Sequence, residues 1–453
     1  MLPIVTPEEM RVIDAWAPEP AEVLIGRAGA AIARAALRML GGTYGRTVVV
    51  IAGKGNNGAD GRVAAKLLAD RGARVRVVDA AAASARIDGA DLVIDAAYGT
   101  GFHGRWTPPD VGDTPVLAVD VPSGVDALTG AIEGDVLAAT RTVTFAALKP
   151  GLLIPPGSDA TGELELVDIG LDVDSAKAHL VQGVDVAGWW PVRALDAHKW
   201  KVAVRIIAGS PAMTGAAIMA SHAAMRTGAG MVHLSVPGQL AQRASLEVVQ
   251  KPLPRIDWAK PALESLDRFG AIVLGPGLGR DDATTNDARK FAIEAPLPTV
   301  IDGDALFALA WNADGAAALL RKRTAPTVLT PHDGEYKLLT GHAPPADRLV
   351  AARRLAADTG CVVLLKGPAT VVAEPHGRTL VVTAGDARLA TAGTGDVLAG
   401  VIGALLGAGL SPLHAAAAGA WVHGQAARRG PVLGLVASDL PELIPGVIAA
   451  FAS

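Results

Sequence analysis

Short runs of apolar, often β-branched residues alternate with alanine-rich stretches along most of the chain. In the first part, the runs at residues 47–52, 74–78, 91–95 and 116–120 predict buried strands, and residues 60–71 predict a helix. Each strand run ends in a polar or glycine-rich loop. This order is typical of an α/β fold in which helices connect parallel strands.

The alternation weakens near residues 150–156 and 188–191, and residues 172–196 carry neither a strand run nor glycine turns, so we expect a linker there. The pattern then restarts with its own set of elements. A helix is expected over 216–227, strands over 202–208, 231–236, 271–274, 299–301, 327–329 and 362–366, and a hairpin from 370–373 and 379–383. The region after the hairpin is expected to be helical. We therefore expect two domains, residues 1–190 and residues 198–453.

The composition narrows the functional classes. Hydrophobic residues make up 50% of the 453 residues, but no run reaches the roughly 18 uncharged apolar residues of a membrane span. A formal net charge of -4 argues against a nucleic-acid partner. Cys361 is the single cysteine, which excludes an internal disulfide and a multi-thiolate metal site. The N-terminus has no secretory pattern, so the sequence predicts a cytoplasmic protein without a membrane partner.

Residues 53–58, with the sequence GKGNNG, follow a strand run and open a helix, where backbone amides can bind an anion. The segment fits G-x-G-x-x-G, and Asp79 lies 21 residues after Gly58, where a Rossmann fold places its ribose-binding acid. A nicotinamide oxidoreductase is therefore one interpretation, and a tight turn without function is another. Asn56, Asn57 and Asp60 argue against the oxidoreductase, because a Rossmann loop favours small residues there.

Two further loops follow strand runs, at residues 95–101 (DAAYGTG) and 120–126 (DVPSGVD). The carboxyl ends of parallel strands form the usual ligand edge of a sheet, and an acid there can orient a ligand, hold a cation or accept a proton. The alternative is that Asp95 and Asp120 cap the turns that follow them. Asn57, Asp95 and Ser123 offer only oxygen ligands, which favours a hard metal ion.

Together, residues 52–61 (AGKGNNGADG), 95–101 and 119–126 (VDVPSGVD) resemble the epimerase half of the NAD(P)H-hydrate repair enzymes. The resemblance implies a Rossmann-like three-layer αβα domain that interconverts the R and S forms of hydrated NADH and NADPH. It implies that Asp120 is the catalytic acid or base, and that Asn57, Asp95 and Ser123 bind potassium. By matching residue, it implies that the hydrate contacts Asn56, Asn57, Gly58, Ala59, Asp60, Gly99, Thr100, Gly101, Phe102, His103, Gly104 and Arg105.

In the second part, residues 392–396 (AGTGD) precede the apolar helix expected at 397–406. Glycines there let backbone amides approach a phosphate at a helix N-terminus, and Asp396 is placed to deprotonate a hydroxyl that attacks the phosphate. The alternative is a capped helix with an acid in its first turn. Loops at 275–279 (GPGLG), 330–335 (TPHDGE) and 366–370 (KGPAT) also adjoin expected strands.

These loops resemble the dehydratase half of the same enzymes, which has a ribokinase-like α/β fold, over residues from about 198 to 425. The resemblance implies that this half uses ADP with magnesium to dehydrate the S form, giving AMP and phosphate, with Asp396 as the catalytic base. It assigns Ala216, Gly277 and His332 to the hydrate site, and the nucleotide phosphates to Lys366, Gly367, Pro368, Ala369, Thr370 and Gly395. Ala59, Arg62, Trp200 and Gly303 depart from the family pattern.

The sequence thus predicts a bifunctional repair enzyme that acts on the small molecules NADHX, NADPHX and ADP and forms a homo-oligomer. Two alternatives stay open. One is a ribokinase-like kinase of a small vitamin alcohol joined to an unrelated dinucleotide-binding domain. The other is a nucleotide-binding scaffold without catalysis. Asp120 and Asp396 argue against a scaffold, because a binder of anionic phosphates gains nothing from acids at those places.

Overall fold

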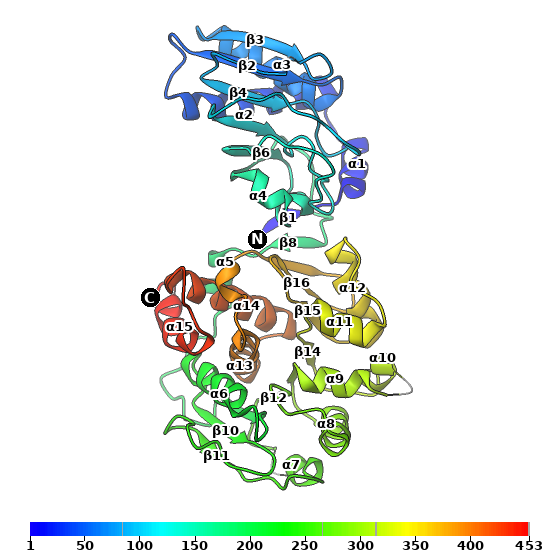
Figure 1. The fold of residues 1–453 in the computed structure, drawn as a ribbon, viewed down its shortest axis with the longest axis vertical. Coiled ribbons are helices and arrows are strands. Elements are labelled where there is room, and N and C mark those ends of the chain that lie inside the picture. Colours follow the sequence, from blue (N-terminus) through cyan, green and yellow to red (C-terminus); the bar gives the residue numbers. More distant parts are fainter. Residues whose placement is uncertain (84, 265, 313–314, 452–453) are drawn as a thin grey trace. The chain divides into compact units, whose positions relative to one another are not determined.

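The fold in Figure 1 is a computed structural model that describes residues 1–83, 85–264, 266–312 and 315–451. Internal contacts divide the chain into two compact units, Leu2–His179 and Leu180–Ser453, and Met1 is grouped with the second. Both units are α/β structures with parallel sheets, as the alternating pattern predicts. None of the helices in the described ranges is long and apolar enough to span a membrane.

The first unit is built on a parallel sheet with the strand order β3-β2-β4-β5-β6-β7. These strands, preceded by β1 (Leu2–Ile4), are β2 (Thr47–Ala52), β3 (Arg74–Asp79), β4 (Leu92–Ala96), β5 (Val116–Val119), β6 (Arg141–Phe145) and β7 (Glu163–Val167). The helices are α1 (Pro7–Ala15), α2 (Ala21–Leu40), α3 (Asn56–Ala69), α4 (Gly157–Thr161) and the short 3₁₀ helix η1 (Pro150–Leu152).

Both faces of this sheet are buried, which explains why its central strands are continuous apolar runs. In β2, Val48 and Val50 pack in the core formed with α1, α2 and α3, whereas Val49 and Ile51 pack in a second core with Trp106. The three-layer arrangement therefore has long helices on one face. The other face is covered by loops, η1 and α4.

The second unit has a larger sheet. Seven of its strands, β9 to β15, are parallel to one another. At one end, β16 pairs antiparallel with β15, and β17 pairs antiparallel with β16. Starting from β17, the strands in spatial order are β17 (Thr379–Val382), β16 (Thr370–Ala373), β15 (Val362–Leu365), β14 (Thr327–Leu329), β13 (Thr299–Ile301), β12 (Ala271–Leu274), β9 (Ala203–Ile207), β10 (Met231–Ser235) and β11 (Val249–Gln250). The expected hairpin at 370–383 is confirmed as β16 and β17.

The helices of the second unit lie in two groups. A core under the sheet contains α5 (Gly183–Trp189), α6 (Thr214–Arg226), α13 (Thr394–Gly407), α14 (Pro412–Arg429) and α15 (Leu440–Ala449). The others are α7 (Ala259–Leu263), α8 (Asp282–Glu294), α9 (Asp304–Ala310), α10 (Gly315–Leu320), α11 (Asp333–Thr340) and α12 (Arg348–Thr359), with 3₁₀ turns η2 (Ala387–Leu389) and η3 (Ala437–Asp439). Figure 1 shows α8, α9, α11 and α12 one after another beside the strands.

Close packing fixes the N-terminus of α13 beside the strand ends. A Cβ atom at Gly400 would lie 2.1 Å from the Ala220 carbonyl oxygen of α6, and one at Gly403 would lie 2.3 Å from the Val273 side chain of β12. Neither distance leaves room for a side chain, so the two glycines let α13 sit directly on α6 and the sheet. The loop that ends at Asp396 is thereby held in one place.

The expected linker over 172–196 is wrong for residues 178–189. It contains β8 (Ala178–Leu180) and α5, and Val181 and Val186 are buried in the core of the second unit. Residues 180–190, which we expected in the first domain, therefore pack with the second unit. The sequence signal was weak because β8 has three residues and α5 has seven. Both are shorter than the stretches over which hydrophobic periodicity identifies a strand or a helix.

Two candidate active sites

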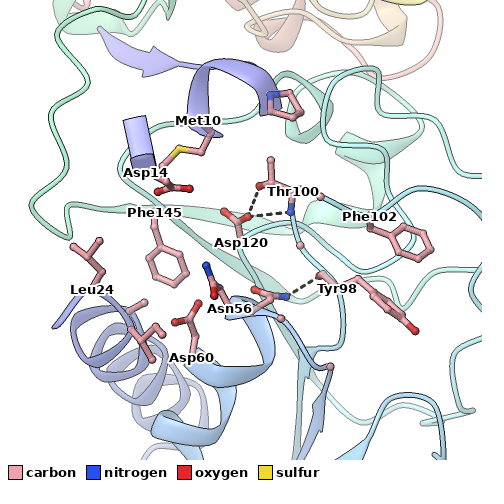
Figure 2. Close-up of a pocket in the computed structure, with 18 of the residues that line it drawn as sticks. Met10, Asp14, Leu24, Asn56, Asp60, Tyr98, Thr100, Phe102, Asp120 and Phe145 are labelled. Atoms are coloured by element: carbon pink, nitrogen blue, oxygen red, sulfur yellow. Dashed lines mark hydrogen bonds between the residues drawn. The ribbon is translucent and has the colours of Figure 1, made fainter. Parts of the chain in front are cut away.

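The first unit contains a cavity of about 1300 Å³ at the carboxyl ends of its parallel strands. Its walls come from the loops after β2, β3, β4 and β5 and from helices α1 and α2, and Figure 2 shows the side chains that face it. One part of the lining is apolar, with Met10, Leu24 and Phe145, and the other part is polar, with Asn56, Thr100 and Asp120. Such a cavity suits a ligand that has both a ring and charged groups.

Asp120 lies at the end of β5 with a φ of 64°, a left-handed conformation that is uncommon for a residue with a Cβ atom. Its Oδ1 accepts hydrogen bonds from Lys149 Nζ at 2.6 Å and from Thr144 Oγ1 at 3.2 Å. Its Oδ2 accepts one from the Thr100 amide at 3.3 Å and another from the Thr100 hydroxyl (Figure 2). Burial raises the pKa of Asp120, but Lys149 and the Thr100 donors outweigh it, so the pKa lies below its usual range.

Lys149 is 1% exposed and donates to three oxygens. Besides Asp120, its Nζ contacts Thr144 Oγ1 at 3.0 Å and the Phe145 carbonyl at 3.1 Å. A buried ammonium that donates all three of its protons to fixed acceptors is held in one position. Lys149 therefore holds Asp120 ionised and oriented toward the cavity.

Two other carboxyl groups face the same cavity, and both favour the neutral form more than an exposed aspartate does. Burial, with a smaller contribution from the charge of Asp120, raises the pKa of Asp60 to about 8. Burial also raises the pKa of Asp14, with the charge of Lys149 opposing it. The cavity thus combines an ionised carboxylate with a carboxyl that is protonated at neutral pH, which is the charge arrangement of an acid–base pair.

Oxygen atoms gather beneath the cavity, where α3 meets the ends of β4 and β5. Ser123 Oγ donates to Asp95 Oδ1 at 2.6 Å, and Asn57 Nδ2 donates to the Tyr98 carbonyl at 2.7 Å. Asp95 is fully buried, and burial raises its pKa despite the hydrogen bonds from Ser123 and Ala97. Asn57 Oδ1 is buried without a hydrogen-bond partner. Ser123 Oγ also donates to the Tyr98 carbonyl, at 3.1 Å, so Asn57 and Ser123 meet at that oxygen. An unpaired buried amide oxygen, a hydroxyl and a carboxylate are ligands that suit a hard cation.

Of the residues that the sequence assigns to the hydrate, most line the cavity and some do not. Asn56, Asn57, Asp60 and Gly99, Thr100, Gly101, Phe102 and His103 are in its lining. Gly58, Ala59, Gly104 and Arg105 are not. Gly58 has a structural role, because a Cβ atom there would lie 1.9 Å from the Gly53 carbonyl oxygen. Arg105 donates to the Glu133 carbonyl at 2.8 Å, and Arg62, one of the departures from the pattern, donates to the Gly53 carbonyl at 2.9 Å.

In the second unit, Asp396 lies in the first turn of α13 among other charged groups at the strand ends. Burial is the main cause that raises the pKa of Asp396 to about 7; the charges of Asp302, Asp304 and Glu335 add to it, and Lys366 opposes it. A carboxyl group with this pKa is ready to accept a proton near neutral pH. Asp396 therefore has the electrostatic setting of a general base.

Lys366, at the end of β15, connects the acids of this cluster. Its Nζ donates to Asp302 Oδ1 at 2.9 Å and lies 3.5 Å from Glu335 Oε2. Burial lowers the pKa of Lys366, but Asp302 and Glu335 outweigh it, so the pKa lies above its usual value. A Cβ atom at Gly395 would lie 3.4 Å from Lys366 Nζ, so the α13 N-terminus and the lysine adjoin.

The other residues assigned to the second site lie on loops of the same edge. Gly277 has a φ of 63°, and a Cβ atom there would lie 2.8 Å from the Ala216 Cβ, so these two residues adjoin. His332 caps α11, accepting from the amides of Gly334 and Glu335 through Nδ1. In the loop after β15, Gly367 and Pro368 are exposed and Ala369 is buried, while Thr370 begins β16.

The sequence did not single out Lys149, Thr144 and Asp14 in the first site, or Asp302 and Glu335 as members of the second. Lys149 carries a signal, because it is the sole charged residue in the apolar stretch 142–158. Asp302 repeats the pattern that drew attention to Asp95 and Asp120, an acid directly after a buried strand. Asp14 lies one turn after the buried Met10 of α1 and lines the cavity.

The comparisons with known proteins cover both units. A family model described as NAD(P)H-hydrate dehydratase matches residues 204–444, and a model described as YjeF-related protein N-terminus matches residues 21–86 and 79–151. The bifunctional NAD(P)H-hydrate repair enzyme Nnr of Moorella thermoacetica is 36% identical, covering 98% of this chain and 96% of its own length. The enzyme of the same name from Mycobacterium leprae is 40% identical, with 90% of this chain and 89% of its own length covered.

Among solved structures, the ADP/ATP-dependent NAD(P)H-hydrate dehydratase from Bacillus subtilis, co-crystallised with ATP and Mg²⁺, is 30% identical with a TM-score of 0.52. The match covers 60% of this chain and 97% of that one. Near-complete coverage of relatives named as bifunctional enzymes, together with a site at the strand ends of each unit, leads to one assignment. The chain belongs to the family of bifunctional NAD(P)H-hydrate repair enzymes.

Proposed function

We propose that the first unit epimerises hydrated NADH and NADPH and that the second unit dehydrates the S form with a nucleotide as the phosphoryl donor, restoring NADH and NADPH. The observation that carries the proposal is Asp120, a buried carboxylate held ionised by Lys149 in a cavity that also contains the protonated Asp60. The family membership supports the pairing of the two reactions in one chain.

The epimerisation needs a base and an acid. Hydration beside the ring nitrogen leaves a hydroxyl on a carbon that also bonds to nitrogen, so the carbon is inverted when that C–O bond breaks and forms again on the other face. We assign to Asp60 the proton given to the departing hydroxyl. Asp120 takes the proton from the water that adds to the opposite face, and Thr100 and Lys149 hold its carboxylate in place. One water leaves and one water adds, so the substrate atoms balance. Asp60 ends with one proton fewer and Asp120 with one more, and exchange with solvent returns both groups to their starting state before the next turnover.

Asn57, Asp95 and Ser123 are proposed to hold potassium, with Asn57 Oδ1 as the oxygen that gains a partner. A bound cation would supply a positive field under the loop of residues 98–101 and keep its amides directed at the cavity. Replacing potassium by a large organic cation at constant ionic strength should slow epimerisation more than dehydration. An equal loss in both reactions would indicate a general salt effect.

In the second unit, Asp396 is assigned the proton of the ring hydroxyl as that oxygen attacks the terminal phosphoryl group of the nucleotide. The bond between that phosphorus and the rest of the nucleotide breaks as the new bond forms, and the shortened nucleotide departs. Phosphate then leaves the ring carbon in place of hydroxide, and the neighbouring ring carbon loses a proton, which restores the double bond of NADH or NADPH. Lys366 and the amides near Gly395 are positioned to contact the phosphate chain. Among the described residues, no group of three or more His, Cys, Asp or Glu side chains is arranged as a metal site. Magnesium would be bound largely by the phosphates, supported by one or two carboxylates such as Asp302.

We propose ADP as the phosphoryl donor, as the resemblance implies, with AMP and phosphate as products. The deciding quantity is the ratio of kcat/KM for ADP and ATP. A preference for ATP of about tenfold would reverse the choice of donor and leave the dehydratase assignment intact. Homo-oligomerisation and a cytoplasmic location stay predictions from the sequence.

One assay tests the function as a whole. The purified protein is given a chemically prepared mixture of both NADH hydrate epimers with ADP, and the absorbance of reduced nicotinamide is followed. Full recovery of NADH supports both reactions, and recovery of about half supports dehydration alone. A stable phosphorylated product from a vitamin alcohol and ATP, with no NADH formed, would favour the kinase alternative instead.

A further inference from the structure

Asp79 lines the same cavity, but neither proposed reaction uses it. It is the last residue of β3 and pairs in register with Ala52, the last residue of β2. The amide of Ala80 donates to the Ala52 carbonyl at 3.1 Å, so the strand ends stay joined as far as the loop. Asp79 therefore lies one strand, or about 4.8 Å, from the turn that begins at Gly53.

The Asp79 carboxylate is fixed but still open to a ligand. Its Oδ1 accepts a hydrogen bond from the Ala81 amide at 2.8 Å, and the residue is exposed. The neighbours that follow it in the cavity wall, Ala80 and Ala81, are small and uncharged. A carboxylate held in this way can accept hydrogen bonds from a pair of hydroxyls, whereas it repels a phosphate group.

The strand order says which half of a dinucleotide reaches Asp79. β2 lies between β3 on one side and β4 on the other, and the sheet continues from β4 to β5 and Asp120. A ligand whose phosphates meet the N-terminus of α3 is thus divided between the two sides. If the nicotinamide ring lies at Asp120, the adenosine ribose lies on the β3 side.

We propose that Asp79 is a specificity-determining residue that accepts the ribose hydroxyls of the adenosine half and disfavours a 2′-phosphate. The epimerase site then prefers the NADH hydrate to the NADPH hydrate. This inference rests on the proposed epimerase function. The basic group that could oppose it is Lys54, which lines the cavity in the turn after β2. We assign Lys54 to the pyrophosphate, because it belongs to the turn at the α3 N-terminus.

The test measures kcat/KM for conversion of each separated R epimer to the S epimer, using the full chain without nucleotide. Uncatalysed conversion is subtracted. The unmodified protein should favour the NADH hydrate by about tenfold or more, and Asp79→Asn should reduce that ratio to within about threefold of unity by improving use of the NADPH hydrate. Asp70→Asn is the matched control, because Asp70 is an exposed acid at the other end of α3. It should leave the ratio unchanged.

The proposal is overturned if the unmodified protein uses both hydrates equally, a result that needs no variant to fold. It is also overturned if Asp79→Asn leaves the ratio unchanged. A preference for the NADPH hydrate that disappears in Lys54→Met would assign the ribose side to Lys54 instead. Absence of catalysed conversion for both hydrates would refute the epimerase function itself, and this outcome is distinct from the other three.

Discussion

Two aspartates in one cavity, Asp120 and Asp60, are shifted in opposite directions by their neighbours. Burial favours the neutral form of both, but Asp120 receives hydrogen bonds from Lys149 and Thr100, which hold its pKa below the usual range. Asp60 has no such compensation, and burial together with the charge of Asp120 raises its pKa to about 8. The difference between the two carboxyl groups therefore depends mainly on one buried lysine.

Replacing Lys149 by methionine should raise the pKa of Asp120, because burial would no longer be offset by a positive charge. We expect kcat/KM for epimerisation to fall by about 10²-fold or more at pH 6, with partial recovery as the pH is raised. Dehydration should be unchanged. The measurement is a pH profile of each reaction.

Lys66→Met is the matched control for that variant, because Lys66 is an exposed lysine on α3. It should reproduce the unmodified profile. If the decrease of the epimerisation rate at low pH occurs at the same pH in Lys149→Met as in the unmodified protein, Lys149 does not set the charge of Asp120. This outcome would contradict the positioning role of Lys149 even if the rate fell.

The raised pKa of Asp60 predicts a dependence of stability on pH. Between about pH 4 and about pH 8 the folded chain retains a proton that the unfolded chain has lost, so the free energy of unfolding of the first unit falls as the pH rises. Asp60→Asn removes this dependence. The difference in Tm between Asp60→Asn and the unmodified protein should grow in favour of the variant from pH 5 to pH 8.

The same substitution should slow epimerisation by about 10²- to 10⁴-fold, because asparagine cannot supply the proton. In the unmodified protein the rate should fall as the pH rises through about 8, where Asp60 ionises. A variant that is both less stable at pH 8 and fully active would refute the assignment of Asp60.

At the scale of helices and strands, the sequence predicts well the strands that end at the two candidate sites. Each of these strands is a short apolar run followed by an acid or a glycine-rich loop. The strands expected at 47–52 and 271–274 have those bounds in the structure, and the helix expected at 216–227 differs by two residues at its start and one at its end. The helix expected to begin at residue 60 begins instead at Asn56. Asn and Gly favour turns, so the pattern hid the first turn of α3.

Asp396 lies in the first turn of α13, where an acid can take part in the reaction or only stabilise the helix. Replacing it distinguishes these two roles. Asp396→Asn should lower the rate of dehydration by about 10²- to 10⁴-fold and leave epimerisation unchanged. Asp282→Asn, which removes an acid from the first turn of α8, should affect neither reaction. Equal losses in the two variants would mean that helix stabilisation explains the effect.

At the scale of the whole molecule, the site contacts that the sequence could not supply are those between distant segments. Lys149 meets Asp120 across 29 residues, and Lys366 meets Asp302 across 64. Periodicity gives each strand end separately, but it does not say which ends adjoin. That information comes from the strand order, which places β5 beside β6 and β13 two strands from β15.

Each compact unit contains its own site, since the cavity around Asp120 is lined by residues from 7 to 171 and Asp396 lies in the other unit. The two reactions should therefore be separable by mutation and restored by mixing. From an equal mixture of the two NADH hydrate epimers, the Asp120→Asn variant should restore about half as NADH after spontaneous epimerisation is subtracted. The Asp396→Asn variant should restore none. An equimolar mixture of the two variants should recover all of it. Failure of the mixture, with both variants folded, would mean that the S epimer is not released to solvent.

The left-handed backbone at Asp120 also limits the routes by which this position can change over generations. A single base change converts an aspartate codon to Asn, Gly, Ala, Val, Glu, His or Tyr. Of these, Asn and Gly adopt a φ near 64° most readily, while β-branched valine resists it most strongly. The mutations that the fold tolerates best at this position are thus ones that remove the carboxylate. A lineage that no longer needs epimerisation should accumulate asparagine or glycine at residue 120 while its first unit stays folded.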